Sequence, residues 1–219
     1  MPLMLGSIAP DFEADTTEGP IQFYRWLKDR WCLFFSHPKD FTPVCTTELG
    51  ALAHLKPEFD QRGVCVIGLS IDSVADHLRW SEDIAETQGL APNFPLIADE
   101  QLNVAKLYGM LPADSDGVAA DRTATDNATA RSVYVINPNR EIALSLTYPM
   151  TTGRNFHEIL RVIDSLQLTA RHQVATPADW RFGDDVIITP AVSDEEAQRR
   201  FSSGWKAPRP YLRLVEQPA

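Results

Sequence analysis

The chain has 219 residues, of which 44% are hydrophobic and 23% charged, and its formal net charge at pH 7 is −10. This is the composition of a globular protein with enough apolar residues to bury a core. The acidic balance argues against a protein that binds nucleic acid or an anionic membrane surface, because both need a basic surface. No apolar run approaches the roughly 20 residues that would cross a bilayer.

The three cysteines, Cys32, Cys45 and Cys65, are odd in number and show no C-x-x-C spacing. Such a pattern argues against a disulfide framework and against a zinc site. The chain also starts without the basic and apolar stretches of a signal peptide. The sequence therefore predicts a cytoplasmic protein with free thiols.

Strand and helix patterns alternate in the first half of the chain. The apolar runs have the continuous character of strands covered on both faces, and each helix pattern stops at a glycine. The predicted order is a strand at 31–35, a helix from Pro43 to about Arg62, a strand at 64–71 and a helix from Ser73 to about Gln88.

The second half predicts shorter elements and one hairpin. A short strand at 94–97 and a short helix at 102–108 come first, and strands at 132–136 and 142–148 then flank the turn residues 137–140. A helix that begins near Gly153 would place Phe156, Ile159, Leu160 and Ile163 on one face. This order predicts an α/β fold with a mixed central sheet flanked by helices.

Two stretches differ from the rest. Residues 112–130 are rich in Ala, Asp, Thr and Ser and lack apolar periodicity, which predicts a long surface loop. After about residue 169 prolines and scattered aromatic residues replace the long apolar runs. We therefore expect two parts, a main domain at 1–168 and an extension at 169–219 that packs on the main domain or on a partner subunit.

Cys45 lies where its surroundings favour a reactive thiol. Thr42 is a good N-cap residue and Pro43 suits the first helical position, so Cys45 falls in the first turn of the predicted helix. The unpaired N–H groups and the positive end of the dipole there favour a thiolate, which is the nucleophilic form of cysteine. The strand at 31–35 comes just before, and nucleophiles in such sheets usually follow the carboxyl end of a strand.

The motif Pro38-x-x-x-Thr42-x-x-Cys45 resembles that of the peroxiredoxins, and its neighbours resemble the one-cysteine, peroxiredoxin-6-like branch. The resemblance spans almost the whole chain. The segments that carry it are 36–50, 70–73, 75–78, 80–81, 148–149, 151–155, 176–180, 183–184, 192–197 and 210–213.

The resemblance implies a thioredoxin-like fold with a C-terminal dimerisation extension and the activity of a thiol peroxidase, and it implies no metal, haem, flavin or other cofactor. Cys45 would attack the O–O bond of hydrogen peroxide or a small organic hydroperoxide and become a sulfenic acid. Thr42 would orient the thiolate and the peroxide, Arg131 would stabilise the sulfur and the developing oxyanion, and Pro38 would shield the sulfur from water. The chemistry agrees, since O–O displacement needs a thiolate, charge stabilisation and exclusion of water.

Three further residues have supporting roles in this resemblance. His37 would lie near the sulfur, and Glu48 would hold Arg131 together with a second arginine, Arg154. Each has a plainer reading: His37 as an ordinary loop histidine, Glu48 as part of a helix-capping pattern, and Arg154 as a surface residue at a helix start. Cys32 and Cys65 lie inside apolar strand runs and are predicted to be buried hydrophobic residues rather than resolving cysteines.

Two other functions stay open from the sequence. The chain could be a Cys–His acyl hydrolase that uses His37 as its base, although it has no nucleophile-elbow motif. It could also be an oligomeric holdase-type chaperone. Under the peroxidase hypothesis the partners are the peroxide, an external thiol such as thioredoxin or glutathione, and a second copy of the chain in a homodimer or a larger oligomer.

Overall fold

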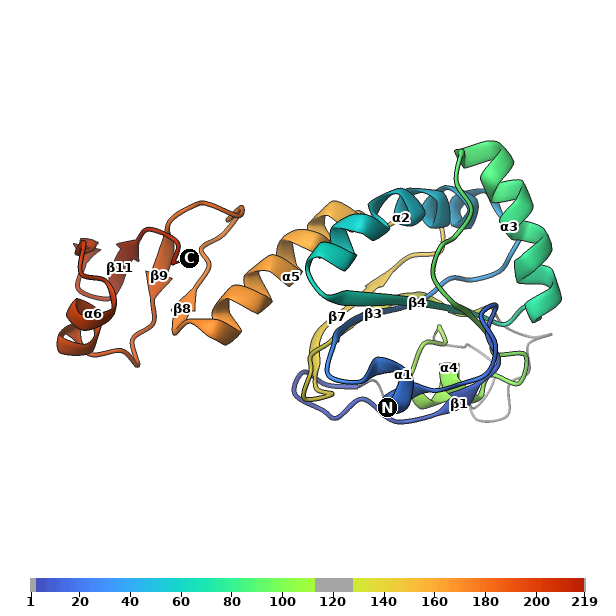
Figure 1. Ribbon diagram of the computed structural model, residues 1–219, viewed down its shortest axis with the longest axis horizontal. Coiled ribbons are helices and arrows are strands. Elements are labelled where there is room, and N and C mark those ends of the chain that lie inside the picture. Colours follow the sequence, from blue (N-terminus) through green and yellow to red (C-terminus); the bar gives the residue numbers. More distant parts are fainter. Residues whose placement is uncertain (1–2, 113–127, 219) are drawn as a thin grey trace. The chain divides into compact units, whose positions relative to one another are not determined.

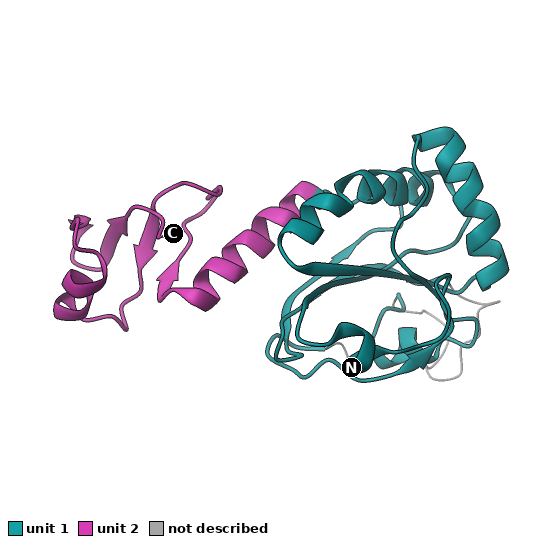
Figure 2. Ribbon diagram, viewed as in Figure 1, with its two compact units in different colours: residues 1–156 teal, residues 157–219 magenta. Residues whose placement is uncertain are grey.

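The computed structural model describes residues 3–112 and 128–218. These residues form two compact units, Met1–Phe156 and His157–Ala219 (Figure 2). The last long helix, α5 (Phe156–Arg171), is thereby grouped with the second unit, whereas the sequence pattern had suggested a division after residue 168.

A five-stranded sheet in the order β5-β4-β3-β6-β7 forms the centre of the first unit (Figure 1). The three strands β3, β4 and β5 are parallel, and β6 and β7 add to them in antiparallel fashion. This is the mixed sheet that the sequence predicts, in a thioredoxin-like arrangement. The strands are β3 (Trp31–Ser36), β4 (Val64–Ser70), β5 (Leu96–Ala98), β6 (Arg131–Ile136) and β7 (Ile142–Tyr148).

Helices cover both faces of this sheet. Figure 1 shows α2 (Pro43–Gln61) and α3 (Val74–Gln88) on one face and the short α1 (Phe23–Leu27) and α4 (Asn103–Leu107) on the other. A two-stranded ribbon of β1 (Glu13–Ala14) and β2 (Ile21–Gln22) precedes α1. Because both faces are covered, every residue of β4 is buried, as its continuous apolar run predicts.

Close packing requires a glycine in β4. A Cβ atom at Gly68 would lie 2.7 Å from Leu96 Cδ2 and 2.8 Å from Phe35 Cζ. Even one methyl group at this position would therefore overlap with two core side chains. Because Gly68 has no side chain, the side chains of its two neighbours in the sheet, Leu96 in β5 and Phe35 in β3, can pack directly against its backbone.

The two long helices of this unit begin and end as their sequences predict. The Ser73 hydroxyl accepts a hydrogen bond from the Asp76 N–H at the start of α3, and Gly89 ends that helix with a left-handed φ of 84°. Helix α2 begins at Pro43, with Thr42 at the N-cap position. The last strand of the parallel set, β5, begins at Leu96 rather than at the predicted residue 94, because Pro95 has no N–H to pair.

The second unit has a small sheet and a core of its own. Its four antiparallel strands are ordered β10-β11-β9-β8, and a helix, α6 (Asp194–Arg200), precedes β10. Trp180 is 1% exposed at the centre of its apolar cluster. The strands are β8 (Val174–Ala175), β9 (Val186–Ile188), β10 (Lys206–Arg209) and β11 (Leu212–Val215).

Most of the predicted loop at 112–130, namely residues 113–127, lies outside the described residues. Among the residues that are described, no helix has both the length and the apolarity to cross a membrane.

Candidate active site

Cys45 lies in the first turn of α2 and is completely buried, with 0% of its surface exposed. Its sulfur accepts a hydrogen bond from Nη1 of Arg131, which lies 3.3 Å away. Arg131 is the first residue of β6, the strand next to β3. The helix start and the guanidinium therefore both present positive charge to the same sulfur, which is the environment that stabilises a thiolate.

Glu48, one turn further along α2, joins two arginines beneath Cys45. Its carboxylate accepts a 2.6 Å bond from Arg131 Nη1. It also accepts bonds from Arg154 Nε and Nη2, at 2.9 and 2.7 Å, in a bidentate pair. All three side chains are at most 3% exposed. The sequence-predicted group of Cys45, Arg131, Glu48 and Arg154 is thus brought together by the fold.

Further hydrogen bonds fix the two guanidinium groups. Arg131 Nε donates to the Met150 carbonyl at 2.9 Å, and Arg154 Nη1 donates to the carbonyls of Ser36 and Ser132. The Arg154 guanidinium also lies 4.9 Å from the ring centre of Phe35. Neither arginine is a surface residue, so the plainer interpretation of Arg154 is excluded. Arg131 is held with one nitrogen directed at the sulfur.

Thr42 occupies the predicted N-cap position but does not cap the helix with its side chain. Its hydroxyl instead donates a 2.9 Å hydrogen bond to the Lys39 carbonyl. The prediction that Thr42 is the N-cap residue is thus right for the position and wrong for the bond that such residues usually make. Because the hydroxyl hydrogen is engaged, the lone pairs of Oγ1 stay available to accept a bond from a thiol or a peroxide.

Pro38 and His37 lie in the loop between β3 and α2, and both are buried. The loop is anchored through His37, whose N–H donates to Leu69 O and whose carbonyl accepts from the Thr129 hydroxyl at 2.6 Å. The His37 ring lies 5.3 Å from that of Trp80 in α3, and Trp80 Nε1 donates to the hydroxyl of Thr46, the neighbour of Cys45. His37 is therefore enclosed between the start of α2 and α3.

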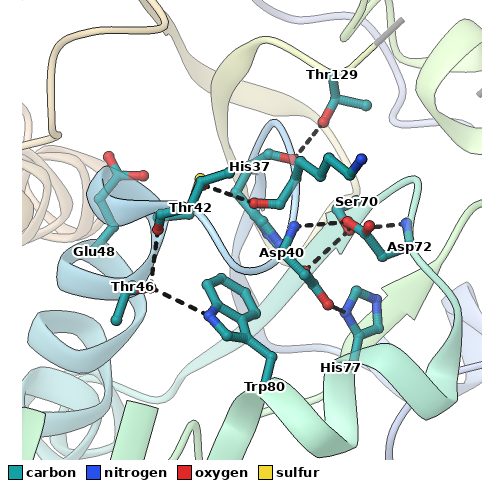
Figure 3. Close-up of polar contacts among 12 residues, drawn as sticks. His37, Asp40, Thr42, Thr46, Glu48, Ser70, Asp72, His77, Trp80 and Thr129 are labelled. Carbon is teal, nitrogen blue, oxygen red and sulfur yellow. Dashed lines mark hydrogen bonds and ion pairs between the residues drawn. The ribbon is translucent and has the colours of Figure 1, made fainter. Parts of the chain in front are cut away.

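Asp40 connects His37 to a second buried histidine (Figure 3). Its Oδ1 lies 2.8 Å from His37 Nε2, and its Oδ2 lies 2.6 Å from His77 Nδ1. The other nitrogen of His77 lies 3.1 Å from the Ile97 carbonyl. Both histidines are 0% exposed. Within the described part of the chain, His37 Nδ1 is the only buried side-chain nitrogen or oxygen without a hydrogen-bond partner.

The charges in this cluster differ between the two histidines. Burial lowers the pKa of His37 more than Asp40 raises it. Burial also disfavours the charged form of His77, but the hydrogen bond and charge of Asp40 outweigh it and raise the pKa of His77. Asp40 is disfavoured as an anion by its burial, yet its two histidine partners hold the pKa of its carboxyl at about 2.

The donor atoms of His37, Asp40 and His77 lie within 4.8 Å of one another, as the ligands of a metal ion would. However, the carboxylate oxygens are at hydrogen-bond distance from the ring nitrogens, and the remaining His77 nitrogen bonds to a backbone carbonyl. Apart from His37 Nδ1, these contacts give each ring nitrogen and carboxylate oxygen of the group a hydrogen-bond partner without an ion. The cluster fits a hydrogen-bonded chain better than a metal centre.

Sequence reasoning missed Asp40, His77 and Thr129. A signal for His77 was present, because it shares the buried face of α3 with Trp80 and Ile84 at positions i, i+3 and i+7. A histidine in such a stripe needs hydrogen-bond partners. Thr129, by contrast, lies at the end of the predicted surface loop and gave no such signal.

Cys32 and Cys65 lie at the far end of the sheet from Cys45. They are opposite one another in the register of β3 and β4, near the amino ends of these parallel strands, whereas Cys45 follows the carboxyl end of β3. Both are buried, and burial raises the pKa of Cys32 above its ordinary value. Their position agrees with the prediction that neither acts as a resolving cysteine.

Comparison with known proteins matches both parts of the chain. Residues 5–145 match the AhpC/TSA family, and residues 165–204 match the C-terminal domain of 1-Cys peroxiredoxin. A 1-Cys peroxiredoxin of Dictyostelium discoideum is 50% identical over 99% of this chain and 86% of its own length. Human peroxiredoxin-6 is 50% identical over 99% of this chain and 98% of its own.

Solved structures agree with this assignment. The crystal structure of a mutant peroxiredoxin 6 from Arenicola marina has a TM-score of 0.88 and 48% identity, and covers 99% of both chains. A yeast mitochondrial 1-Cys peroxiredoxin, whose thiol is resolved through glutathione/thioredoxin systems, has a TM-score of 0.87 and 49% identity. It covers 98% of this chain and 99% of the yeast chain. The chain therefore belongs to the peroxiredoxin family, in its one-cysteine, peroxiredoxin-6-like branch, and is a thiol-dependent peroxidase.

Proposed function

We propose that Cys45 is the residue that reduces the peroxide. The observation that carries this proposal is the 3.3 Å contact between the Cys45 sulfur and Arg131 Nη1 in a buried site. A thiolate held there attacks one oxygen of a hydroperoxide, so that an S–O bond forms and the O–O bond breaks. The leaving oxygen takes up a proton to give water or an alcohol, and the sulfur becomes a sulfenic acid.

The residues around Cys45 have different roles in this step. Arg131 stays charged at any physiological pH and stabilises both the thiolate and the negative charge that develops on the leaving oxygen. Glu48 and Arg154 hold Arg131 in place. Thr42 Oγ1 accepts a hydrogen bond from the peroxide, and Pro38 keeps water away from the sulfur. His37 provides a further hydrogen-bonding group at the buried end of the loop.

The full burial of the sulfur favours small substrates, namely hydrogen peroxide and small organic hydroperoxides. The sulfenic acid is recycled by an external thiol: a first thiol condenses with it to give a disulfide and water, and a second thiol releases the cysteine. Thioredoxin and glutathione are the candidates, since the yeast relative is resolved through these systems. The three free thiols favour a cytoplasmic location.

We also propose that the chain forms a homodimer, on which larger oligomers can be built, through residues 169–219. Exposed apolar side chains in this region, such as Phe182 at 72% and Tyr211 at 77%, support an interface. Sedimentation at micromolar concentration should give twice the mass of one chain. A compact monomer would exclude the dimer.

One experiment tests the recycling partner. Peroxide consumption is measured side by side with thioredoxin and its reductase, with glutathione, and with a small dithiol. Wild-type protein is compared with the Cys45→Ser variant. Turnover should require Cys45 with every reductant, and the thiol that gives the highest rate identifies the partner. Peroxide turnover by the Cys45→Ser variant would overturn the proposed role of this residue.

A further inference from the structure

His77 has a geometry that defines its protonation. Its Nδ1 faces a carboxylate oxygen of Asp40 at 2.6 Å and its Nε2 faces the Ile97 carbonyl at 3.1 Å. Both of these groups can only accept hydrogen bonds, so both ring nitrogens must carry a hydrogen. A ring with two N–H groups is an imidazolium. His77 is thus a buried cation, and Asp40 is its counter-ion.

Asp40 in turn defines the state of His37. Its carboxylate accepts from His77 at one oxygen, and the other oxygen lies 2.8 Å from His37 Nε2, which must therefore carry the hydrogen. A second hydrogen, on Nδ1, would create another buried cation without an acceptor among the described residues. Burial and the nearby Arg154 oppose that charge and lower the pKa of His37. His37 is the neutral Nε2–H tautomer, and its Nδ1 is a free acceptor.

A buried acceptor without a partner is costly, and it points to a donor that arrives during function. His37 is on the loop that leads to Cys45, and its ring packs on Trp80, which bonds to the residue next to Cys45. The O–H groups that enter this site are those of the peroxide and of the sulfenic acid. Both can donate to Nδ1 of His37, and neither can accept from it in this tautomer.

We propose that Asp40 and His77 are positioning residues for the reaction at Cys45, because they fix His37 as the tautomer whose Nδ1 accepts a hydrogen bond from the O–H of the bound peroxide or of the sulfenic acid. This inference rests on the proposed role of Cys45. It adds a chain of three side chains, from α3 through the β3–α2 loop, to the residues around the sulfur. No proton leaves the three side chains; His37 keeps its bond to Asp40 and gains a hydrogen-bond partner at Nδ1.

The Asp40→Asn substitution tests the proposal because it changes which ring nitrogen of His37 carries the hydrogen. Asparagine has one acceptor oxygen instead of two, and His77 loses its counter-ion. When the amide oxygen accepts from His77, the amide NH₂ faces His37 Nε2, which must then give up its hydrogen. Nδ1 becomes the protonated nitrogen and changes from an acceptor to a donor. The side-chain volume is almost unchanged.

The first measurement needs no variant and no peroxide. In ¹⁵N-histidine-labelled wild-type protein, imidazole spectra should show two protonated nitrogens for His77, and one protonated Nε2 with an unprotonated Nδ1 for His37. A protonated Nδ1 on His37, or a neutral His77, at neutral pH would overturn the proposal whether or not the protein turns over peroxide.

The second measurement is kinetic. Fully reduced protein is mixed with one equivalent of hydrogen peroxide, so that no reductant is involved. We expect Asp40→Asn to slow sulfenic acid formation about 10- to 100-fold, the effect of losing one oriented hydrogen bond in a buried site. His77→Gln keeps a donor to Asp40 but lacks the charge, so a smaller decrease is expected. The spectrum of His37 should change tautomer in Asp40→Asn.

The matched control is Asp99→Asn. Asp99 is also buried and accepts two hydrogen bonds, from the backbone N–H groups of Val104 and Ala105 at the start of α4. The Asp99→Asn variant therefore loses a buried carboxylate that is not part of the His37–Asp40–His77 chain. A rate for Asp40→Asn within about threefold of that control would overturn the proposal. If the Cys45→Ser variant consumed peroxide, the proposed role of Cys45 would fail, while the histidine spectra would still decide the tautomers.

Discussion

The contact between Arg131 and Cys45 predicts how strongly the peroxidase depends on one guanidinium. At 3.3 Å and an effective dielectric constant of about 20, a guanidinium and a thiolate attract each other by about 5 kcal/mol. This is an upper bound, because Arg131 also lies 2.6 Å from the negative charge of Glu48. Since Arg154 remains nearby, we expect the Arg131→Met substitution to remove about 3–4 kcal/mol of transition-state stabilisation.

This loss corresponds to a decrease of about 10²- to 10³-fold in the rate of the peroxide step. The rate is measured by stopped-flow fluorescence after fully reduced protein is mixed with one equivalent of hydrogen peroxide. Trp80 lies beside the site and provides the signal. Arg131→Lys keeps a positive charge but loses the planar fork, so its rate should fall between those of Arg131→Met and wild type.

Arg161→Met is the control, because Arg161 belongs to the second unit and forms a partly exposed ion pair with Glu158 there. Thermal unfolding shows whether each variant is folded before its rate is interpreted. A folded Arg131→Met protein whose rate is within about threefold of wild type would refute the reasoning, since the guanidinium would then stabilise neither the thiolate nor the leaving oxygen.

Three other predictions follow. Cys45→Ser should abolish peroxide consumption in a coupled assay, whereas Cys32→Ser and Cys65→Ser should keep it, and an inactive Cys65→Ser protein that is still folded would contradict the one-cysteine assignment. Glu48→Gln should lower the free energy of unfolding by about 3–5 kcal/mol in denaturant titrations, because it leaves two buried guanidinium groups without their carboxylate; an unchanged midpoint would show that this ion cluster is not stabilising. Because the pKa of His77 is raised above 6.5 in the folded state, its contribution to stability is fully present below pH 6.5 and is lost as the pH rises through the raised value. The difference in unfolding free energy between wild type and His77→Gln should therefore shrink at alkaline pH, and a difference that grows there would contradict the assigned charge.

The sequence was sufficient for the elements that carry Cys45. Apolar runs predicted β3 and β4, and Thr42 with Pro43 predicted the start of α2, because these signals act over a few residues. The roles of Arg131 and Arg154 came only from resemblance to the peroxiredoxins. Their contacts with Glu48 span 83 and 106 positions, and no local pattern encodes them.

The histidine chain shows the same limit. Asp40 and His77 are 37 positions apart, and each alone has an ordinary explanation in its own segment. Only the packing of α3 against the β3–α2 loop makes them partners. The Thr42 hydroxyl illustrates a smaller limit: the sequence predicts its position at the helix start, but the hydroxyl donates to Lys39 O and accepts no backbone N–H of the first turn.

The Arg131–Glu48–Arg154 cluster has a consequence for recycling. It ties the first two turns of α2 to β6 and to the segment before α5, so these three parts of the unit open together or not at all. A sulfur with no exposed surface cannot meet a protein thiol while they are closed. Each ion pair that holds the arginine on the sulfur thus also delays its release to the reductant. Glu48 therefore favours fast reduction of the peroxide by Cys45 but slows the later reduction of the oxidised sulfur by an external thiol.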